Sequence, residues 1–544
     1  MQKRMKNIQK LFVVPLTLSL LTGCAGEKPP QEQEIKVFTS FLSAVSPDIN
    51  ENNKIQQMIA EKIGAMCDET WIDEKDEASN IISNMIMSED YPDFIYPEAS
   101  EYQKLRNAGA FIPIDEYWDD YPNLKNFYSE SEWDKIRDPD GHIYKIPSFS
   151  KCYMYDTNTI HNDEAFWVQV KVLQWAGYPE IVTLDDYFNL LEKYIEANPV
   201  GENGEPNIAY EILADESIFF CLDNPPQFLD GYPNDGACIV DPETLEAIDY
   251  NTTPTAKKWF QKLNEEYHKG IIDPECFMLS PNQYYDRIKS GNVLGMVDQF
   301  WNFRNAADQL PDKCKYVPLG VVIEEGIEEH YHSQIAFDPS SGLGITTSCD
   351  DVDGALKFVN DLLDPEILNL RFWGIEDEDY SVDENGIFYL TDEQYEKNHD
   401  PEYAAQNRCV YKYFPYYWGM NQDGINAYSP THQPNEFYES LSDIMKECFS
   451  AYGVQTYVEM LNPATENAPW YPMWSYTGTF TDDTDYGKAK TNIDKMKFKY
   501  LPKIVMSDDF ESAWEEYMTE YAANCDVQAY LDELTAEVRR SVEK

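Results

Sequence analysis

The chain has 544 residues, with 98 Asp or Glu against 42 Lys or Arg, so its formal net charge is −56 at pH 7. Nucleic acid and anionic lipid headgroups repel a chain this acidic, which excludes both as expected partners. A single hydrophobic core is not expected at this length, and size alone predicts roughly two to four domains.

The first 26 residues have the three regions of an export signal. Four basic residues come first, namely Lys3, Arg4, Lys6 and Lys10. The apolar run Leu11–Leu21 is too short to span a bilayer comfortably. Residues 21–24 (LTGC) resemble the bacterial lipobox, which implies that residues 1–23 are removed as a signal peptide and that Cys24 carries lipid. The alternative is an ordinary secretory signal with a cysteine nearby.

The mature chain is predicted to be a soluble body on a tether. Removing residues 1–23 takes away four basic and no acidic residues, so the formal charge falls from −56 to about −60. Residues 24–33 are mostly polar, with two prolines, and are expected to form the tether. No second apolar stretch is long enough to cross a membrane, so membrane contact is expected only through the Cys24 lipid.

The folded part begins with an α/β unit. Residues 34–41 alternate in the manner of a strand, and residues 52–64 and 77–87 place Ile and Met at helical spacing. Residues 91–96 (YPDFIY) predict a short strand entered through a proline turn. This alternation predicts an α/β layer with parallel pairing.

A second α/β unit follows, and the chain becomes largely helical after residue 440. Thr183 and Asp186 form a capping pair for a predicted helix over 183–196. The other predicted elements are a helix over 253–270 with proline at its first position, strands over 293–297 and 343–347, helices from 351 and from 365, and a last long helix from about 507.

Motifs over most of the mature chain resemble, in order, those of extracellular solute-binding proteins of carbohydrate-type ABC importers (family 1, long lipoprotein subgroup). The segments that carry the resemblance are residues 78–113, 141–147 (GHIYKIP), 183–188 (TLDDYF), 291–301 (GNVLGMVDQFW), 341–363 and 372–380 (FWGIEDEDY). Each motif alone is weak, whereas their order and spacing are fairly specific.

The resemblance implies a two-lobe, periplasmic-binding-protein-like fold of type II, with a hinge and extra C-terminal helices. It places residues 34–148 and 338–430 in lobe one, and residues 149–337 and 431–544 in lobe two, which ends in the helical part. It also implies a monomer on the outer face of the bacterial cell membrane, which delivers its ligand to the transmembrane subunits of an ABC permease.

The residue chemistry independently fits a sugar ligand. Aromatic residues make up 14% of the chain, and several follow predicted strands, where α/β sheets place ligand clefts. Aromatic faces stack on the C–H face of a sugar ring, while carboxylates and amides bind its hydroxyls. Trp301 is the first candidate because it matches the stacking Trp of maltodextrin-binding relatives, and Asp298 is a candidate hydroxyl acceptor.

The other candidate binding residues are Ser40, Phe41, Tyr96 and Glu98 on the lobe-one wall, Lys151 and Tyr153 past the crossing, and Trp373 and Tyr380 closing the cleft from the other side. Core packing is the competing interpretation for each aromatic residue. Two further aromatic clusters lie at residues 411–418 and 470–474. One interpretation is that they extend a sugar-binding platform, and the other, which we favour, is that they pack a C-terminal subdomain.

No cofactor, metal or catalytic role is predicted. His330 and His332 suit a metal on one strand face, but no third ligand is identifiable and a solvated loop is favoured. The loop 198–207 lacks the Asp residues of the calcium loop found in related proteins. None of the ten cysteines other than Cys24 forms a Cys-x-x-Cys pair, and their disulfide state is not predicted.

The sequence therefore predicts a binding protein for an oligosaccharide or sugar derivative. A surface glycoside hydrolase is the main alternative, but 98 acidic residues make chance carboxylate pairs uninformative. A receptor for peptides or other solutes with the same fold, and an adhesion lipoprotein without a soluble ligand, are the remaining alternatives.

Overall fold

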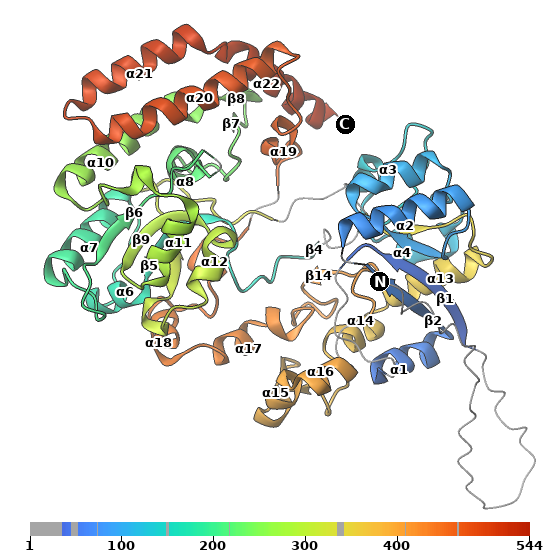
Figure 1. Ribbon diagram of the computed structural model, residues 1–544. Coiled ribbons are helices and arrows are strands. Elements are labelled where there is room, and N and C mark those ends of the chain that lie inside the picture. The colour runs from blue at the N-terminus through green and yellow to red at the C-terminus, as the bar shows by residue number, and fades with distance from the viewer. Residues whose placement is uncertain are drawn as a thin grey trace, which may run out of the picture.

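The structure is a computed structural model that describes residues 35–44, 53–72, 74–147, 152–216, 218–334, 342–407, 410–464 and 467–543. Figure 1 shows two bodies joined by several connections. One body carries the blue N-terminal elements with the yellow helices, and the other carries the green elements with the red C-terminal helices. We call them lobe one and lobe two.

Lobe one is built on a four-stranded sheet with the strand order β11-β3-β1-β2. Its strands are β1 (Lys36–Leu42), β2 (Ala65–Trp71), β3 (Phe94–Tyr96) and β11 (Gly344–Ile345). Strand β1 pairs in parallel with β3, as predicted, and also with β2, whereas β11 returns antiparallel to β3. Strand β2 was not predicted, because charged residues in its middle interrupt the alternation of apolar and polar positions.

Lobe one contains the helices predicted over 52–64 and 77–87, and from 351 and 365, together with helices that the periodicity did not predict. They are α1 (Lys54–Ile63), α2 (Lys75–Ser88), α3 (Ala99–Asn107), α4 (Pro122–Lys125), α5 (Glu130–Lys135), α13 (Val352–Leu362) and α14 (Pro365–Phe372). Asn53 caps α1 through its side chain, and Gly64 ends it with a φ of 74°.

Lobe two contains a second four-stranded sheet, with the strand order β10-β5-β9-β6. Its strands are β5 (Glu164–Gln169), β6 (Ile208–Glu211), β9 (Val293–Gln299) and β10 (Tyr316–Leu319). Strand β5 is antiparallel to both β9 and β10, and β6 is parallel to β9. The sheet is therefore mixed.

The helices of lobe two surround this sheet and continue into the C-terminal part. They are α6 (Val170–Ala176), α7 (Leu184–Ala197), α8 (Phe220–Asp223), α9 (Pro225–Leu229), α10 (Pro254–Lys269), α11 (Pro281–Lys289), α12 (Phe300–Ala307), α18 (Asp443–Tyr452), α19 (Met473–Thr477), α20 (Asp485–Met506), α21 (Phe510–Asn524) and α22 (Val527–Glu543). The predicted capping pair Thr183 and Asp186 forms a capping box at α7. Figure 1 shows α20–α22 lying along the side of the lobe near α10.

The two largest hydrophobic cores are separate and discontinuous in sequence. One draws on residues 38–146, 343–370 and 410–414, and the other on residues 165–331 and 445–538. The chain therefore passes between the cores three times, within 147–164, 332–342 and 415–444. We call these segments the three crossings.

Short elements connect the lobes or decorate them. They are β4 (Cys152–Tyr153) and β14 (Trp418–Gly419), the hairpins β7 (Ile239–Asp241)–β8 (Glu246–Ile248) and β12 (Ser381–Val382)–β13 (Phe388–Tyr389), and α15 (Asp392–His399), α16 (Pro401–Asn407) and α17 (Pro434–Glu439). Strand β14 pairs in parallel with β4, so the first and third crossings are hydrogen-bonded to each other.

Nine cysteines in the described ranges carry free thiols. Within the same ranges, no helix is long and apolar enough to cross a membrane, and no group of three potential metal-ligating side chains converges.

Candidate functional site

The three crossings enclose a cavity of about 670 Å³, which we call the hinge cavity. Its volume is within the range of small-molecule sites. The first crossing supplies residues 156 and 158–163 to the cavity walls, and the second supplies His332 and Ser333. The remaining lining residues are Trp418, Pro430, Thr431, His432, Glu436, Phe437 and Ser440 of the third crossing, together with Arg304, Leu390, Tyr395 and His399. A change in the angle between the lobes would alter every wall of this cavity.

The hinge cavity combines aromatic faces with hydrogen-bonding groups. Tyr395, Trp418 and Phe437 supply the rings, while Asn158 and Asn162 supply amides. Such a combination suits a polyhydroxylated ligand, because rings contact its C–H faces and polar side chains bind its hydroxyls.

Four of the seven histidines of the chain line the hinge cavity, although they are far apart in sequence. His161 and His332 lie with ring centroids 6.4 Å apart, and His332 Nε2 is 3.5 Å from the Asp156 carboxylate. The segment around His330 and His332 is a loop, as expected, but its histidines are not solvated. His330 bonds the Gly231 carbonyl at 2.7 Å, and His332 is buried.

The contribution of two cavity histidines to stability is expected to fall as the pH drops from about 7 to 5, because burial holds both imidazoles neutral. Burial lowers the pKa of His161 despite the negative charge of Asp163, and burial likewise lowers the pKa of His432 despite Asp156. The unfolded chain therefore takes up protons first, below about pH 6.5. The stability that the neutral imidazoles contribute is fully present above about pH 6.5, and it is lost as the pH falls below that value.

Melting temperatures of the native chain and of a His161→Gln/His432→Gln double variant, measured from pH 7 to pH 5, test this origin. The variant should lose less stability than the native chain over this interval. Buried carboxyls titrate in both proteins, so the difference between the two profiles isolates the imidazoles. Parallel profiles would contradict the assignment.

Trp301 adjoins the hinge cavity on the lobe-two side without being one of its lining residues. It is the second residue of α12, and its backbone N–H donates to the carbonyl of Asn162, a cavity residue, at 3.3 Å. The side chain remains 50% exposed, and its indole N–H donates to the Gln299 side chain. The Phe220 ring lies 6.0 Å away. Trp301 therefore presents an aromatic face outside the lobe-two core.

Asp298 is not at the surface, in contrast to the role expected for it. It is fully buried, and its carboxylate accepts hydrogen bonds from the Tyr284 hydroxyl at 2.8 Å and the Asn302 amide at 3.0 Å. Burial raises the pKa of Asp298 to about 6, although these hydrogen bonds lower it. The side chain at the end of β9 therefore joins β9 to α11 and α12.

Lobe one presents an aromatic group where its parallel strands end, which we call the lobe-one aromatic wall. Trp71 ends β2 and Tyr96 ends β3, and the Tyr413 ring lies 5.4 Å from Trp71 and 5.1 Å from Tyr96. All three rings are half-buried. Glu98 is exposed nearby, and its charge adds to the burial that raises the pKa of Tyr413. A carboxylate thus borders the rings.

Tyr153 connects this wall to the hinge. It lies in β4, and its ring is 5.6 Å from Tyr417, the residue before Trp418 in β14. Trp418 lines the hinge cavity. Trp301 and Tyr417 do not line the cavity themselves, but each adjoins a residue that does: Trp301 through its backbone bond to Asn162, and Tyr417 as the chain neighbour of Trp418.

The remaining candidates do not join this surface. Ser40 and Phe41 are 2% exposed, because β1 is the inner strand of its sheet between β2 and β3. Trp373 and Tyr380 are 3% and 5% exposed and pack with Phe388 in a small separate core, so they do not offer free faces to a cleft. Lys151 and Cys24 lie outside the described residues.

Trp71 was not among the predicted site residues, and more of residues 411–418 is exposed than the packing interpretation expected. The packing interpretation holds for Tyr411, Phe414 and Tyr416, which are buried, but Tyr413 and Tyr417 are half-buried and extend the wall. Trp71 was missed because it is the last residue of β2, a strand that was not predicted. Of the hinge-cavity histidines, only His332 carried a local signal, as part of the pair with His330, and that pair pointed to a metal and not to this cavity.

The fold is that of the solute-binding proteins of ABC transporters: two α/β lobes joined by three crossings, with extra C-terminal helices. No protein-family model matches the chain. Over 273 residues the chain is 28% identical to the fructooligosaccharide ABC transporter substrate-binding protein FusA of Streptococcus pneumoniae, a match covering 47% of this chain and 48% of that protein. The chain thus matches about half the length of this curated relative.

Solved structures resemble the chain over nearly its whole length. An HMO-binding ABC-transporter-associated solute-binding protein from Bifidobacterium longum infantis superposes with a TM-score of 0.58 and 15% identity, covering 93% of this chain and 98% of that one. A FusA EF-hand mutant from S. pneumoniae in complex with fructo-nystose superposes with a TM-score of 0.55 and 17% identity, covering 94% and 100%. These comparisons confirm the fold expected from the sequence and the resemblance to carbohydrate-type solute-binding proteins.

Proposed function

We propose that this chain is an extracellular binding protein that captures an oligosaccharide or sugar derivative between its lobes and delivers it to an ABC transporter permease. The observation that carries the proposal is the placement of exposed or half-buried aromatic faces on both lobes beside one hinge cavity. Two similar proteins support a glycan as the ligand class, since FusA is a fructooligosaccharide-binding protein and the B. longum protein binds HMO.

The binding surface is proposed to have two walls. Trp301 stacks on the ligand from lobe two, and Tyr96 with Glu98 binds it from lobe one, extended by Trp71 and Tyr413. Tyr153 and the hinge cavity form the base between them. A ligand that contacts both walls in a closed form, but one wall in an open form, shifts the population towards closure.

The domain boundaries follow the cores. We assign residues 34–148 and 338–430 to lobe one and residues 149–337 and 431–544 to lobe two. The separate cores support this division because their members fall on either side of these boundaries. The chain is proposed to act as a monomer, without a cofactor and without catalysis.

The lipid anchor remains a proposal from the sequence. Signal cleavage after residue 23 and lipidation of Cys24 would hold the protein at the outer face of the cell membrane, with residues 24–33 as a tether. Metabolic labelling with a fatty-acid analogue would detect the lipid, and a Cys24→Ser variant should lose the label and leave the membrane fraction. Retention of the label in that variant would contradict the anchor.

A thermal-shift panel with the chain from Ala25 onward tests the ligand class. The panel holds neutral oligosaccharides of several linkages, monosaccharides, peptides and polyamines, and the sugars are analysed afterwards for cleavage. A saturable shift with one family of oligosaccharides and no products is expected. Shifts with peptides or polyamines only would reject a sugar ligand, and cleaved products would favour a hydrolase.

A further inference from the structure

A second cavity, of about 250 Å³, lies in lobe two and shares no lining residue with the hinge cavity. It lies where the C-terminal helices meet the body of the lobe. Its lining residues are Asp223, Gly236, Ala237, Asp249, Trp474, Thr477, Gly478, Lys490, Ile493, Asp494, Lys497 and Tyr530. None of them belongs to a crossing. We call it the lobe-two cavity.

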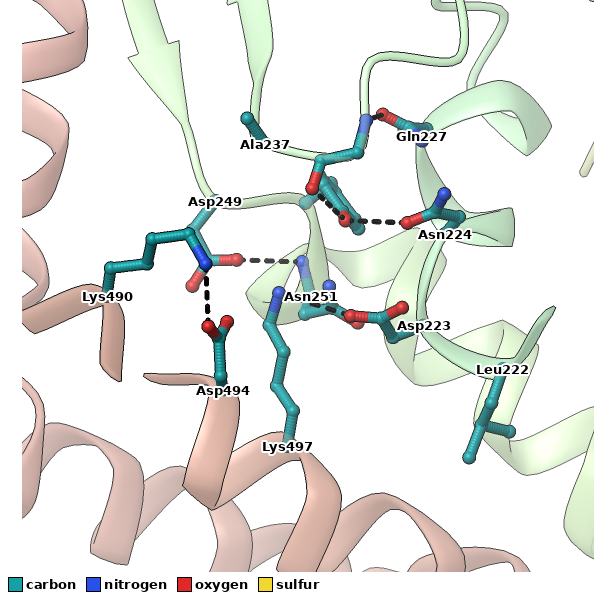
Figure 2. A network of polar contacts seen from close by, with 12 residues as sticks. Leu222, Asp223, Asn224, Gln227, Ala237, Asp249, Asn251, Lys490, Asp494 and Lys497 are labelled. Atoms are coloured by element: carbon teal, nitrogen blue, oxygen red, sulfur yellow. Dashed lines mark hydrogen bonds and ion pairs between the residues drawn. The ribbon is translucent and has the colours of Figure 1, made fainter. Parts of the chain in front are cut away.

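The lobe-two cavity contains both carboxylates and ammonium groups, and they are paired. Lys490 Nζ is 2.7 Å from the Asp494 carboxylate, and Lys497 Nζ is 3.6 Å from the Asp223 carboxylate, as Figure 2 shows. Asp249, the third carboxylate, accepts hydrogen bonds from the Tyr521 hydroxyl and from a backbone N–H. With two cations against three carboxylates, the cavity attracts ligands of neither sign strongly.

Lys497 is a buried charge of this cavity. Its side chain is 9% exposed, and its Nζ also lies 4.9 Å from the centroid of the Tyr250 ring. Burial lowers the pKa of Lys497, but the charges of Asp223, Asp249 and Asp494 outweigh it, so the pKa is raised and the ammonium stays charged. This cation already occupies the position between the carboxylates. A metal ion would have to displace it, which argues for a neutral ligand.

Hydrogen-bonding capacity remains free beside these charges. The Asn251 side chain is fully buried, and neither its amide nitrogen nor its amide oxygen has a hydrogen-bond partner among the described residues. Figure 2 shows Asn251 between Asp249 and Asp223, close to Lys497. Asn251 does not line the cavity, so its amide contributes a polar environment behind the site and not a direct contact. The carboxylates and ammonium groups of the lining supply the acceptors and donors that a ligand with hydroxyls needs.

An exposed aromatic face completes the cavity. Trp474 lines it and is 58% exposed, so it is not packed into the core as the interpretation of residues 470–474 expected. The neighbouring Met473 is buried, and its backbone N–H donates to Asp235 at 2.8 Å, which fixes the start of α19. Trp474 thus presents a ring, from an anchored position, beside paired charges.

We propose that the lobe-two cavity is a second binding site, for a single neutral sugar ring or a polyol of similar size. The ring of Trp474 would stack on its C–H face, while the carboxylates accept from its hydroxyls and the ammonium groups donate to them. The volume is below the roughly 300–1000 Å³ typical of larger ligands, which selects one ring over a chain. This site does not depend on the proposed function of the cleft.

Ligand-observed NMR with D-glucose, D-galactose, D-mannose, D-fructose, N-acetylglucosamine and myo-inositol tests the site on the chain from Ala25 onward. At least one probe should bind, and Trp474→Ala should weaken it at least about tenfold while Trp301→Ala changes it less than about twofold. Lys490→Met should weaken it in the same direction. Trp175→Ala is the matched control, because Trp175 is 47% exposed on α6 and lines neither cavity.

Three results would overturn this site. One is unchanged binding in Trp474→Ala, and another is binding lost in Trp301→Ala but kept in Trp474→Ala, which would place the probe in the cleft. The third is no signal from any probe at concentrations on the order of tens of millimolar. Oligosaccharide binding in the cleft is measured separately through Trp301, so failure of one site leaves the other testable.

Discussion

Replacing Trp301 by alanine is expected to weaken oligosaccharide binding by about 1–3 kcal/mol, or roughly 5- to 150-fold in Kd. The loss would come from the aromatic face that lobe two presents beside the hinge cavity. Because the side chain is 50% exposed, its removal leaves no cavity in the core, and the free energy of unfolding should change little. Calorimetric titration with the oligosaccharide that gives the largest thermal shift measures the effect.

Trp175 provides a control for the loss of an exposed tryptophan as such. It is 47% exposed, close to the value for Trp301, but it lies on α6 and packs edge-on against Tyr194 of α7. Trp175→Ala should leave the affinity unchanged. Equal affinities for the Trp301 variant and the native chain would remove Trp301 from the site and place the lobe-two wall elsewhere.

Replacing Arg371 by methionine is expected to lower the free energy of unfolding by about 3–5 kcal/mol, in the range found when one partner of a buried charged network is removed. Arg371 is 1% exposed. Its guanidinium donates to five backbone carbonyls, those of Leu362, Val410, Tyr411, Phe414 and Pro415, at 2.7–3.3 Å. Methionine fills part of the volume but leaves these buried carbonyls without their donor.

The same substitution is expected to weaken oligosaccharide binding, since four of the five carbonyls belong to residues 410–415. This segment carries Tyr413 and leads to Tyr417, so Arg371 holds the lobe-one aromatic wall in place. Chemical unfolding and calorimetric titration of the same samples measure both effects.

Arg539 is the matched control for Arg371. It is about half-exposed, with a single carboxylate, that of Glu246, at 3.6 Å. Arg539→Met should change stability by less than about 0.5 kcal/mol. A loss below about 1 kcal/mol in Arg371→Met would contradict the clamping role.

The sequence predicted the helices best where a cap and an apolar stripe coincide. Helix α7 begins at the Thr183 capping box, α10 begins with Pro254 and ends at Gly270, and α13 begins at the Asp351 cap. These signals are local, so tertiary contacts do not override them. Strand β2 was missed because its sequence AMCDETW has too few apolar residues to mark a face, and its pairing with β1 comes from tertiary structure.

The site was less predictable, because exposure depends on partners distant in sequence. Trp301 lies in the first turn of α12 and Trp373 at the end of α14, and both were candidates, yet Trp301 is half-exposed while Trp373 packs against Phe388. Asp298 was assigned to the surface, but α11 and α12 enclose it. The hinge cavity gathers residues from all three crossings, so the spacing of its histidines does not point to this cavity.

Small-angle X-ray scattering of the chain from Ala25 onward, with and without a saturating oligosaccharide from the panel, tests most directly whether the two lobes close on a glycan. Closure predicts a smaller radius of gyration with the ligand, and a smaller decrease in Trp301→Ala at the same ligand concentration. An unchanged scattering curve, with saturation confirmed by calorimetry, would contradict capture between the lobes.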